Sequence, residues 1–317
     1  MIFTGHRSID FHGRVRLTSA PESMMDEWRR HLAAQVSSRA MAQSTRISYI
    51  RGMGRFDAWS SAKGRAWNNP ETVVLWRESL VLEGYRAGSI NTWLAGVKSF
   101  FSWATASGWI PKSPAKELSG VSREERDQSR IPLTQGELRR LLAQPDDSSS
   151  GRRDHAMLCM MAFMALRAIE IQRASIGDLY VAHRDHWRLE IAQPAATLPK
   201  SSVEVAPLHA RDALADWLLI HPRAGDSEAP LFVSLGNRSQ GERLTLRAIR
   251  RIIKEHLVSA GVQHPQKSTQ SLRSTAINNA LQSGASLEHV RALSRHRSLM
   301  GFMNQLQRLG TATEQDA

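Results

Sequence analysis

Cysteine is almost absent from this chain of 317 residues, and no long apolar segment occurs in it. The single cysteine, Cys159, stands in the apolar run MLCMMAFMAL, which excludes a disulfide framework and predicts a core thiol. No apolar stretch reaches about 18 residues, and residues 1–19 lack a continuous apolar core, so the sequence predicts neither a membrane span nor a signal peptide. We expect a protein of the reducing cytoplasm, with residues 1–20 as a loosely held N-terminal arm.

Acidic residues are too few to balance the basic ones. Thirty Asp and Glu stand against 42 Lys and Arg, which gives a formal net charge of +12 and a pI near 10.7. Such an excess draws a protein to a polyanion through phosphate neutralisation and counterion release, so nucleic acid is the expected class of partner; a merely basic soluble enzyme is the alternative. No zinc, nucleotide or flavin motif occurs, and we expect no cofactor.

Residues 21–118 have helical periodicity throughout and predict a bundle of four helices joined by short polar turns. Pro70 stands at a plausible first turn of the third helix, and Gly108 follows the last one. Between residues 39 and 65 there are six Lys and Arg against one acid. This basic face is either a solvated surface or a nucleic-acid surface, and counting charges does not separate the two.

The polar segment 119–130, SGVSREERDQSR, is predicted to be a linker, and a second domain occupies residues 131–317. Thr134 and Glu137 have capping-box spacing, which predicts a helix from Gln135. A long buried helix and a short one follow, and the strand-like runs WRLEIAQ and SSVEVAPL then predict a small antiparallel sheet. The remainder is helical, with two glycines at C-terminal cap positions, Gly261 and Gly284. The expected fold is mostly α with one small sheet.

The order of several segments resembles the tyrosine recombinases, the family of phage integrases, integron integrases and Xer-type resolvases. The resemblance runs from about residue 24 to residue 307. It implies that residues 21–118 form a four-helix, SAM-like core-binding domain and that residues 131–317 form a catalytic-type domain. The segments that carry it are STRISYIRGMGRFDAW, GSINTWLAGVKSFFSWATASGWIPKSPAKEL, LTQGELRRLL, ALRAIEIQRASIGDL, PKSSVEVAPL and QSLRSTAINNALQSGASLEHVRALSRHRS.

The resemblance also implies a site that grips one DNA phosphate. Arginine suits this task because its planar fork matches two phosphate oxygens at once. By the resemblance, Arg167 and Arg273 are the two phosphate-gripping arginines, and Lys200 corresponds to a lysine that acts as general acid. His296 corresponds to a later histidine of the site, and Glu170 to an acid that braces it. Taken singly, Arg167 could be a helix-terminal group reaching water, Lys200 a solvated lysine and His296 a surface residue.

Three positions depart from the family pattern around that site. Gln270 stands where the family has a histidine, and glutamine cannot carry a positive charge or shuttle a proton. Ser274 replaces a second histidine. Arg295 replaces the usual glycine before His296, so a positive backbone φ there is expected to be unfavourable.

The family's nucleophilic tyrosine is also missing from its expected place. That position lies nine residues after His296 and holds Gln305, and an amide is not a nucleophile toward phosphorus. The chain has three tyrosines, Tyr49, Tyr85 and Tyr180. The sequence therefore predicts a site that retains its phosphate-binding groups and has lost its attacking group.

Three hypotheses follow for the function. The first is a DNA-binding protein that grips duplex without cutting it, as a regulator, an architectural factor or a non-cutting member of a recombination assembly. The second is an active strand-transfer enzyme whose nucleophile is a partner chain's tyrosine or an unexpected residue such as Ser298. The partners that the resemblance implies are double-stranded DNA and either further copies of this chain on DNA or an active recombinase. The third is a protein-interaction module on a retired recombinase fold. In the first domain, the resemblance places DNA contacts at Thr45, Arg46, Arg51, Asn91 and Lys98.

Overall fold

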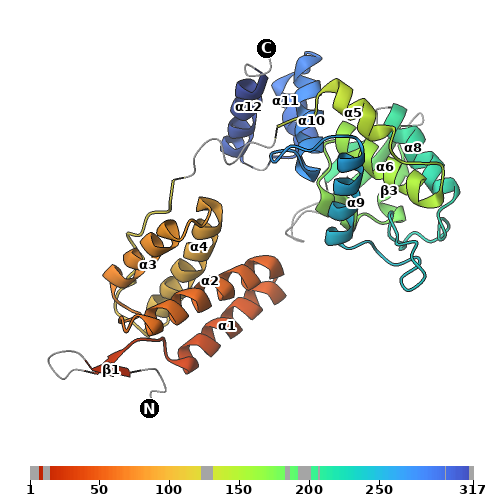
Figure 1. Ribbon diagram of the computed structural model, residues 1–317. Helices are drawn as coiled ribbons and strands as arrows, with labels where there is room; N and C mark the ends of the chain where they lie inside the picture. The colour runs from red at the N-terminus through yellow and green to blue at the C-terminus, as the bar shows by residue number, and fades with distance from the viewer. Residues whose placement is uncertain are drawn as a thin grey trace. The chain divides into compact units, whose positions relative to one another are not determined.

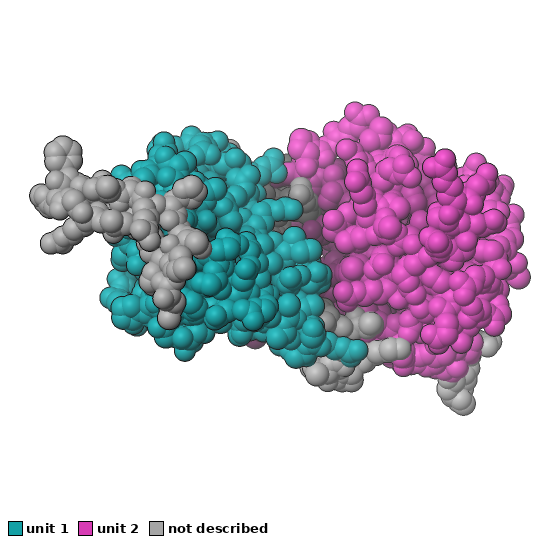
Figure 2. Space-filling model, turned by 90° about the horizontal axis from the view of Figure 1, so that it is seen from below, with its two compact units in different colours: residues 1–127, 194–197 teal, residues 128–193, 198–317 magenta. Residues whose placement is uncertain are grey.

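The computed structural model describes residues 7–9, 15–122, 131–182, 186–191, 201–205, 208–296 and 298–313. The chain divides into two compact units, one of residues 1–127 with 194–197 and one of residues 128–193 with 198–317 (Figure 2). Strands and helices follow one another along the chain as Figure 1 shows.

The first unit contains the four expected helices. Asn69 begins the third of them, because its side-chain oxygen accepts a hydrogen bond from the Glu71 N–H while Pro70 occupies the first turn. Gly108 follows the fourth with a φ of 76°, which glycine adopts at little energetic cost. The helices are α1 (Glu22–Ser37), α2 (Gln43–Ala62), α3 (Pro70–Leu82) and α4 (Ala87–Ala106).

Aromatic side chains fill the core of this bundle. Trp28 and Phe100 pack edge to face with ring centroids 5.4 Å apart, and Phe56 meets Trp76 in the same way at 5.3 Å. Helices α2 and α4 cross with their backbones in close approach, because a Cβ atom on Gly52 would lie 2.5 Å from the Trp93 carbonyl oxygen. The bundle therefore brings the polar ends of α2 and α4 next to one another.

The N-terminal end of this unit is held more firmly than the sequence suggested. Strands β1 (Arg7–Ile9) and β2 (Val15–Leu17) pair antiparallel. Residues 18–20 are buried, the Ala20 N–H donates to Asp57 Oδ1 at 2.8 Å, and the Ser60 hydroxyl donates to the Thr18 carbonyl at 2.9 Å. The predicted loose arm over residues 1–20 is thus wrong for 18–20, because α2 supplies the hydrogen-bonding groups that fix them.

The second unit is mostly helical, as expected. The Thr134–Glu137 capping box is present, and the helix after it begins at Gln135. Gly261 and Gly284 have φ values of 72° and 79° and end the helices before them. The helices are α5 (Gln135–Leu142), α6 (Ser149–Phe163), α7 (Ala168–Arg173), α8 (Leu208–Leu219), α9 (Leu246–Ser259), α10 (Thr269–Gln282), α11 (Leu287–Ser294) and α12 (Leu299–Thr313), with a 3-10 turn at Ile176–Asp178.

A three-stranded antiparallel sheet lies within this unit, in the order β3-β4-β5. Strand β4 (Trp187–Ile191) pairs with β5 (Ser201–Glu204), as the sequence predicted. Strand β3 (Leu179–Val181) was not predicted, since three residues are too few to show an alternating pattern. The central strand turns Leu189 into the core, where it is fully buried.

The core of the second unit centres on α6, which is buried along most of its length. Cys159 lies in this core, where burial raises the pKa of its thiol to about 12 and keeps it unreactive. A separate apolar cluster joins α10, α11 and α12 through Ile277, Val290 and Phe302. This cluster packs the three helices together with Ala165, which follows α6. Within the described part of the chain, no helix is long and apolar enough to cross a membrane.

Candidate functional site

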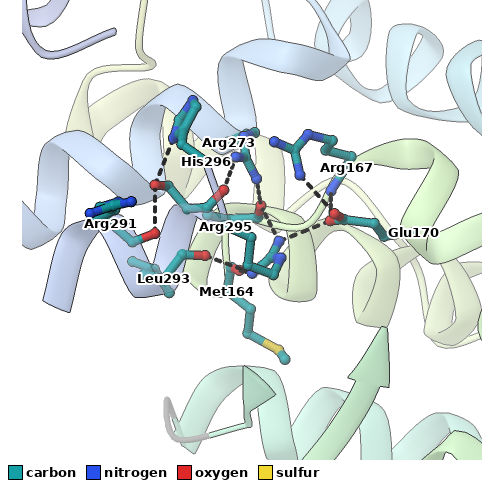
Figure 3. A network of polar contacts seen from close by, with 10 residues as sticks. Met164, Arg167, Glu170, Arg273, Arg291, Leu293, Arg295 and His296 are labelled. Carbon is teal, nitrogen blue, oxygen red and sulfur yellow. Dashed lines mark hydrogen bonds and ion pairs between the residues drawn. The ribbon is translucent and has the colours of Figure 1, made fainter. Parts of the chain in front are cut away.

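Arg167 and Glu170 open helix α7 as a linked pair. The carboxylate of Glu170 folds back and accepts a hydrogen bond from the Arg167 N–H at 2.7 Å, which caps the helix. It also accepts from Nη1 of the Arg167 side chain at 2.8 Å (Figure 3). The Glu170 side chain is only 10% exposed, whereas that of Arg167 is 38% exposed. The bracing acid is therefore buried, and the arginine that it braces reaches the surface.

Arg273 lies in α10 and is 6% exposed. Its guanidinium donates to two backbone carbonyl oxygens, that of Ala165 before α7 and that of Ser294 at the end of α11 (Figure 3). These bonds bring the loop that carries Arg167 and the turn that carries His296 to one side chain of α10. The resemblance implied this convergence, but the carbonyl partners have no sequence signal.

A third arginine, Arg295, joins the same group and was missed as a site residue. Its side chain is 7% exposed, and it donates to Glu170 Oε2 at 2.8 Å and to the carbonyl oxygens of Ala165 and Leu293 at 2.8 and 2.6 Å. Its backbone has a φ of 49°, in the left-handed region that disfavours side chains. The positive φ expected to be unfavourable is thus adopted, and the side-chain contacts offset its cost. We call Arg167, Glu170, Arg273, Arg295 and His296 the arginine cluster.

Positive charge exceeds negative charge in the arginine cluster, since three guanidiniums share one carboxylate. Burial, followed by repulsion from Arg167 and Arg295, lowers the pKa of Arg273 to about 9. Burial alone would raise the pKa of Glu170, but Arg295 and Arg167 outweigh it and hold that pKa below its usual value. A charged carboxylate and three cations leave two net positive charges, an arrangement that an anion would stabilise.

His296 completes the cluster as a neutral group. Its Nδ1 lies 2.7 Å from the hydroxyl of Ser294, and its ring lies beside Phe302 of α12, with centroids 5.7 Å apart. Burial first, and then the charges of Arg273, Arg167 and Arg295, lower its pKa to about 4. Near pH 7 the imidazole can therefore exchange hydrogen bonds with an anion but adds no charge of its own.

A hollow of about 900 Å³ lies beside the cluster, between α7, α9 and the start of α10. Arg167 and Arg273 line it, so the two arginines that the resemblance paired do face one space. Gln270 lines it as well and is exposed there, while Arg250 and Lys254 add cations from α9. Lys200, which the sequence placed in the turn before β5, lies outside the described residues.

Gln305 lies on α12 and contacts α10, the helix that carries Arg273. Its Nε2 is 3.4 Å from the hydroxyl oxygen of Ser274, and Ser274 directly follows Arg273 in the buried part of α10. Tyr180, the one tyrosine of the second unit, lies on β3 with its hydroxyl 3.2 Å from that of Ser202. Ser298 accepts a hydrogen bond from the Gly301 N–H at the start of α12. The residue that contacts α10 from position 305 is thus an amide.

In the first unit, the proposed DNA-contacting residues differ in their surroundings. Thr45 and Asn91 line one shallow hollow of about 360 Å³ between α2 and α4. Arg51 and Lys98 are exposed, and Arg46 is half-buried. The Asn91 amide is occupied, since it exchanges two hydrogen bonds of 2.8 Å with the backbone of Val121. Asn91 therefore holds residue 121, from the predicted linker, against α4.

Comparisons with known proteins agree with this architecture. Residues 132–304 match the phage integrase family, and residues 25–108 match the phage integrase N-terminal SAM-like domain. A tyrosine recombinase of Synechococcus elongatus is 31% identical over 271 residues, which cover 81% of this chain and 82% of that protein. Tyrosine recombinase XerC of Corynebacterium efficiens is 31% identical over 233 residues, covering 71% of this chain and 68% of that one.

Solved structures share the fold at low sequence identity. XerH site-specific recombinase bound to palindromic difH substrate, in a post-cleavage complex, matches with a TM-score of 0.68 and 16% identity, over 94% of this chain and 89% of that one. A lambda integrase dimer bound to a COC' core site matches with a TM-score of 0.65 and 14% identity, over 87% and 95%. The chain is therefore a member of the phage integrase family of tyrosine recombinases.

Proposed function

We propose that this protein grips duplex DNA with the arginine cluster around one phosphate and does not cleave the strand by itself. The phosphate neutralises the excess positive charge of the cluster, with Arg167 and Arg273 as its direct contacts and neutral His296 beside them. Helices α2 and α4 of the first unit contact the duplex through Thr45, Arg51 and Lys98. The role is regulatory, architectural or that of a non-cutting member of a recombination complex.

The observation that carries the proposal is the side chain at position 305. Gln305 of α12 contacts Ser274, the neighbour of Arg273 in α10, so the position where the family pattern expects a nucleophile holds an amide. An amide can donate a hydrogen bond to a phosphate oxygen, but it cannot displace a 5'-oxygen and form a covalent phosphodiester link. Binding without strand cleavage is expected when the arginine cluster holds the phosphate and an unreactive amide faces it.

A nicked suicide duplex tests the absence of cleavage. The labelled duplex is incubated with the parent chain and with Gln305→Tyr, which places a phenol where the amide is. We expect no DNA attached to the parent after denaturation, whereas attachment to Gln305→Tyr would show that the remaining cluster still activates a phosphate. Covalent attachment to the parent would overturn the proposal in favour of an enzyme with an unforeseen nucleophile, and Ser298→Ala would then identify or exclude that residue.

A duplex with single neutral methylphosphonates tests the gripped phosphate. One position should weaken parent binding about tenfold when it is neutralised, which is the loss expected for a charge-assisted contact. In Arg273→Ala the same neutralisation should matter less, because one of the two direct contacts of that phosphate is gone. Equal, small effects at every position would contradict the proposed contact between the arginine cluster and one phosphate, and would favour a protein-interaction module on the same fold.

The alternative of a shared active site has a distinct signature. Both arginines, Glu170 and His296 are in place, so a nucleophile from a partner chain could act on the gripped phosphate. Mixed with an active tyrosine recombinase on one duplex, the parent chain would then promote cleavage at its own half-site, and Arg273→Ala would not.

A further inference from the structure

Arg295 makes contacts that set it apart from the other strained residues of the chain. Three non-glycine residues in the described part of the chain have a positive φ, namely Arg39, Ala165 and Arg295. Arg39 is exposed, but the other two touch, since Arg295 Nη2 donates to the Ala165 carbonyl at 2.8 Å. Strain of this kind persists where surrounding contacts over-determine the backbone, and it gathers at functional sites.

The hydrogen bonds that the two carboxylate oxygens of Glu170 accept indicate the role of Arg295. Glu170 Oε1 accepts from Arg167 Nη1, whereas Oε2 accepts from the Arg167 N–H and from Arg295 Nη2. A carboxylate that is free on both oxygens pairs with a guanidinium through two parallel bonds. Because Oε2 already accepts from the Arg167 N–H and from Arg295, Glu170 holds the side chain of Arg167 through one bond only.

The exposed fractions of the three side chains agree with this sharing of the Glu170 carboxylate. The side chains of Arg295 and Glu170 are 7% and 10% exposed, while that of Arg167 is 38% exposed and lines the hollow. Arg295 also shares the Ala165 carbonyl with Arg273, so it fixes the loop between the two other arginines (Figure 3). We infer that Arg295 is a positioning residue: it partly neutralises Glu170 and thereby leaves Arg167 available to a DNA phosphate.

This inference rests on the proposed phosphate contact. It is tested with two duplexes, one intact and one with a methylphosphonate at the contacted phosphate. The loss of affinity from the first duplex to the second, here called the penalty, should be about tenfold for the parent. Arg295→Gly suits the left-handed backbone but removes the guanidinium, so Glu170 can pair with Arg167 through both oxygens. The penalty should then fall to about threefold. A variant that is folded by circular dichroism and keeps the tenfold penalty would overturn the inference.

Two further variants separate positioning from a purely structural role. Glu170→Gln combined with Arg295→Gly removes the carboxylate that would capture Arg167, so the penalty should return to about tenfold; a penalty that stays near threefold overturns the inference. Arg39→Gly relieves the same backbone strain at an exposed site and should leave the penalty at its parent value, since it changes the affinity for both duplexes alike.

Arg295→Lys serves if Arg295→Gly does not fold. Lysine keeps a positive charge beside Glu170 and should keep most of the penalty, and a folded lysine variant with the penalty reduced to threefold would contradict the role of charge. If the parent itself shows no position with a selective penalty, the proposed phosphate grip has failed, and the inference fails with it.

Discussion

The basic residues proposed to contact DNA in the first unit differ in exposure from the arginines buried in the second. On α2 and α4 of the first unit, Arg51 and Lys98 are exposed to solvent. In the second unit, Arg153, Arg273 and Arg295 are more than nine-tenths buried, and each donates to a backbone carbonyl oxygen. An exposed cation needs no partner in the protein, whereas a buried cation must find hydrogen-bond acceptors or charge partners as the chain folds.

This difference in exposure predicts different contributions to DNA binding. Exposed cations attract a polyanion over the Debye length and contribute through counterion release, with little dependence on exact placement. Arg273 and Arg295 are fixed by the carbonyls of Ala165, Leu293 and Ser294, so the fold sets the positions of their guanidinium groups. We expect changes in the second unit to affect folding and phosphate selectivity, and changes in the first to affect salt-dependent binding.

The largest effect is expected from Glu170→Gln. The change leaves three clustered guanidiniums without a carboxylate, and uncompensated buried charge should lower the free energy of unfolding by roughly 3–5 kcal/mol. Urea unfolding measures it. Glu204→Gln is the matched control, because Glu204 pairs with His186 at the surface, where both side chains are more than 40% exposed; it should change the free energy of unfolding by less than about 1 kcal/mol. Equal losses in the two variants would show that the buried position of Glu170 among the arginines carries no special energetic weight.

Replacing Arg51 and Lys98 together by alanine should leave the free energy of unfolding within about 0.5 kcal/mol of the parent value. Duplex affinity should fall, and the slope of log affinity against log salt should become shallower by about 1.8, from two phosphate contacts. Fluorescence anisotropy over a series of salt concentrations measures the slope. Arg29→Ala is the control, since Arg29 already pairs with Glu22 and Asp26 on α1. An unchanged slope in the double variant would exclude this face as the DNA surface.

The smallest effect is a pH dependence from His296. Its pKa is about 4 in the folded chain and near 6.5 when unfolded, so between these values the unfolded chain binds a proton that the folded chain does not. Stability should fall as pH drops from 6.5 to 4, by about 1 kcal/mol after allowance for the partial exposure of the ring. The difference between the parent and His296→Gln isolates this contribution, and parallel pH profiles would show that the cluster does not repel the imidazolium.

Local sequence patterns predicted the helices because the signals that begin and end a helix are short. The Thr134–Glu137 pair, Pro70 and the glycines at 261 and 284 each act within a few residues, and each helix boundary that they indicated is present. Strand β3 escaped prediction because three residues carry too little pattern. The role of Asn91 in holding Val121 escaped because its partner lies 30 residues away.

The sequence by itself determined most helix boundaries, the excess of positive charge and the amide at position 305, since each is a property of residue type and short spacing. Tertiary structure alone decided that Arg295 is a buried partner of Glu170 rather than a surface cation, and that Ala165 and Ser294 accept from Arg273. The physical reason is that a backbone carbonyl accepts hydrogen bonds whatever its side chain. The acceptors that fix the arginine cluster therefore leave no trace in the sequence.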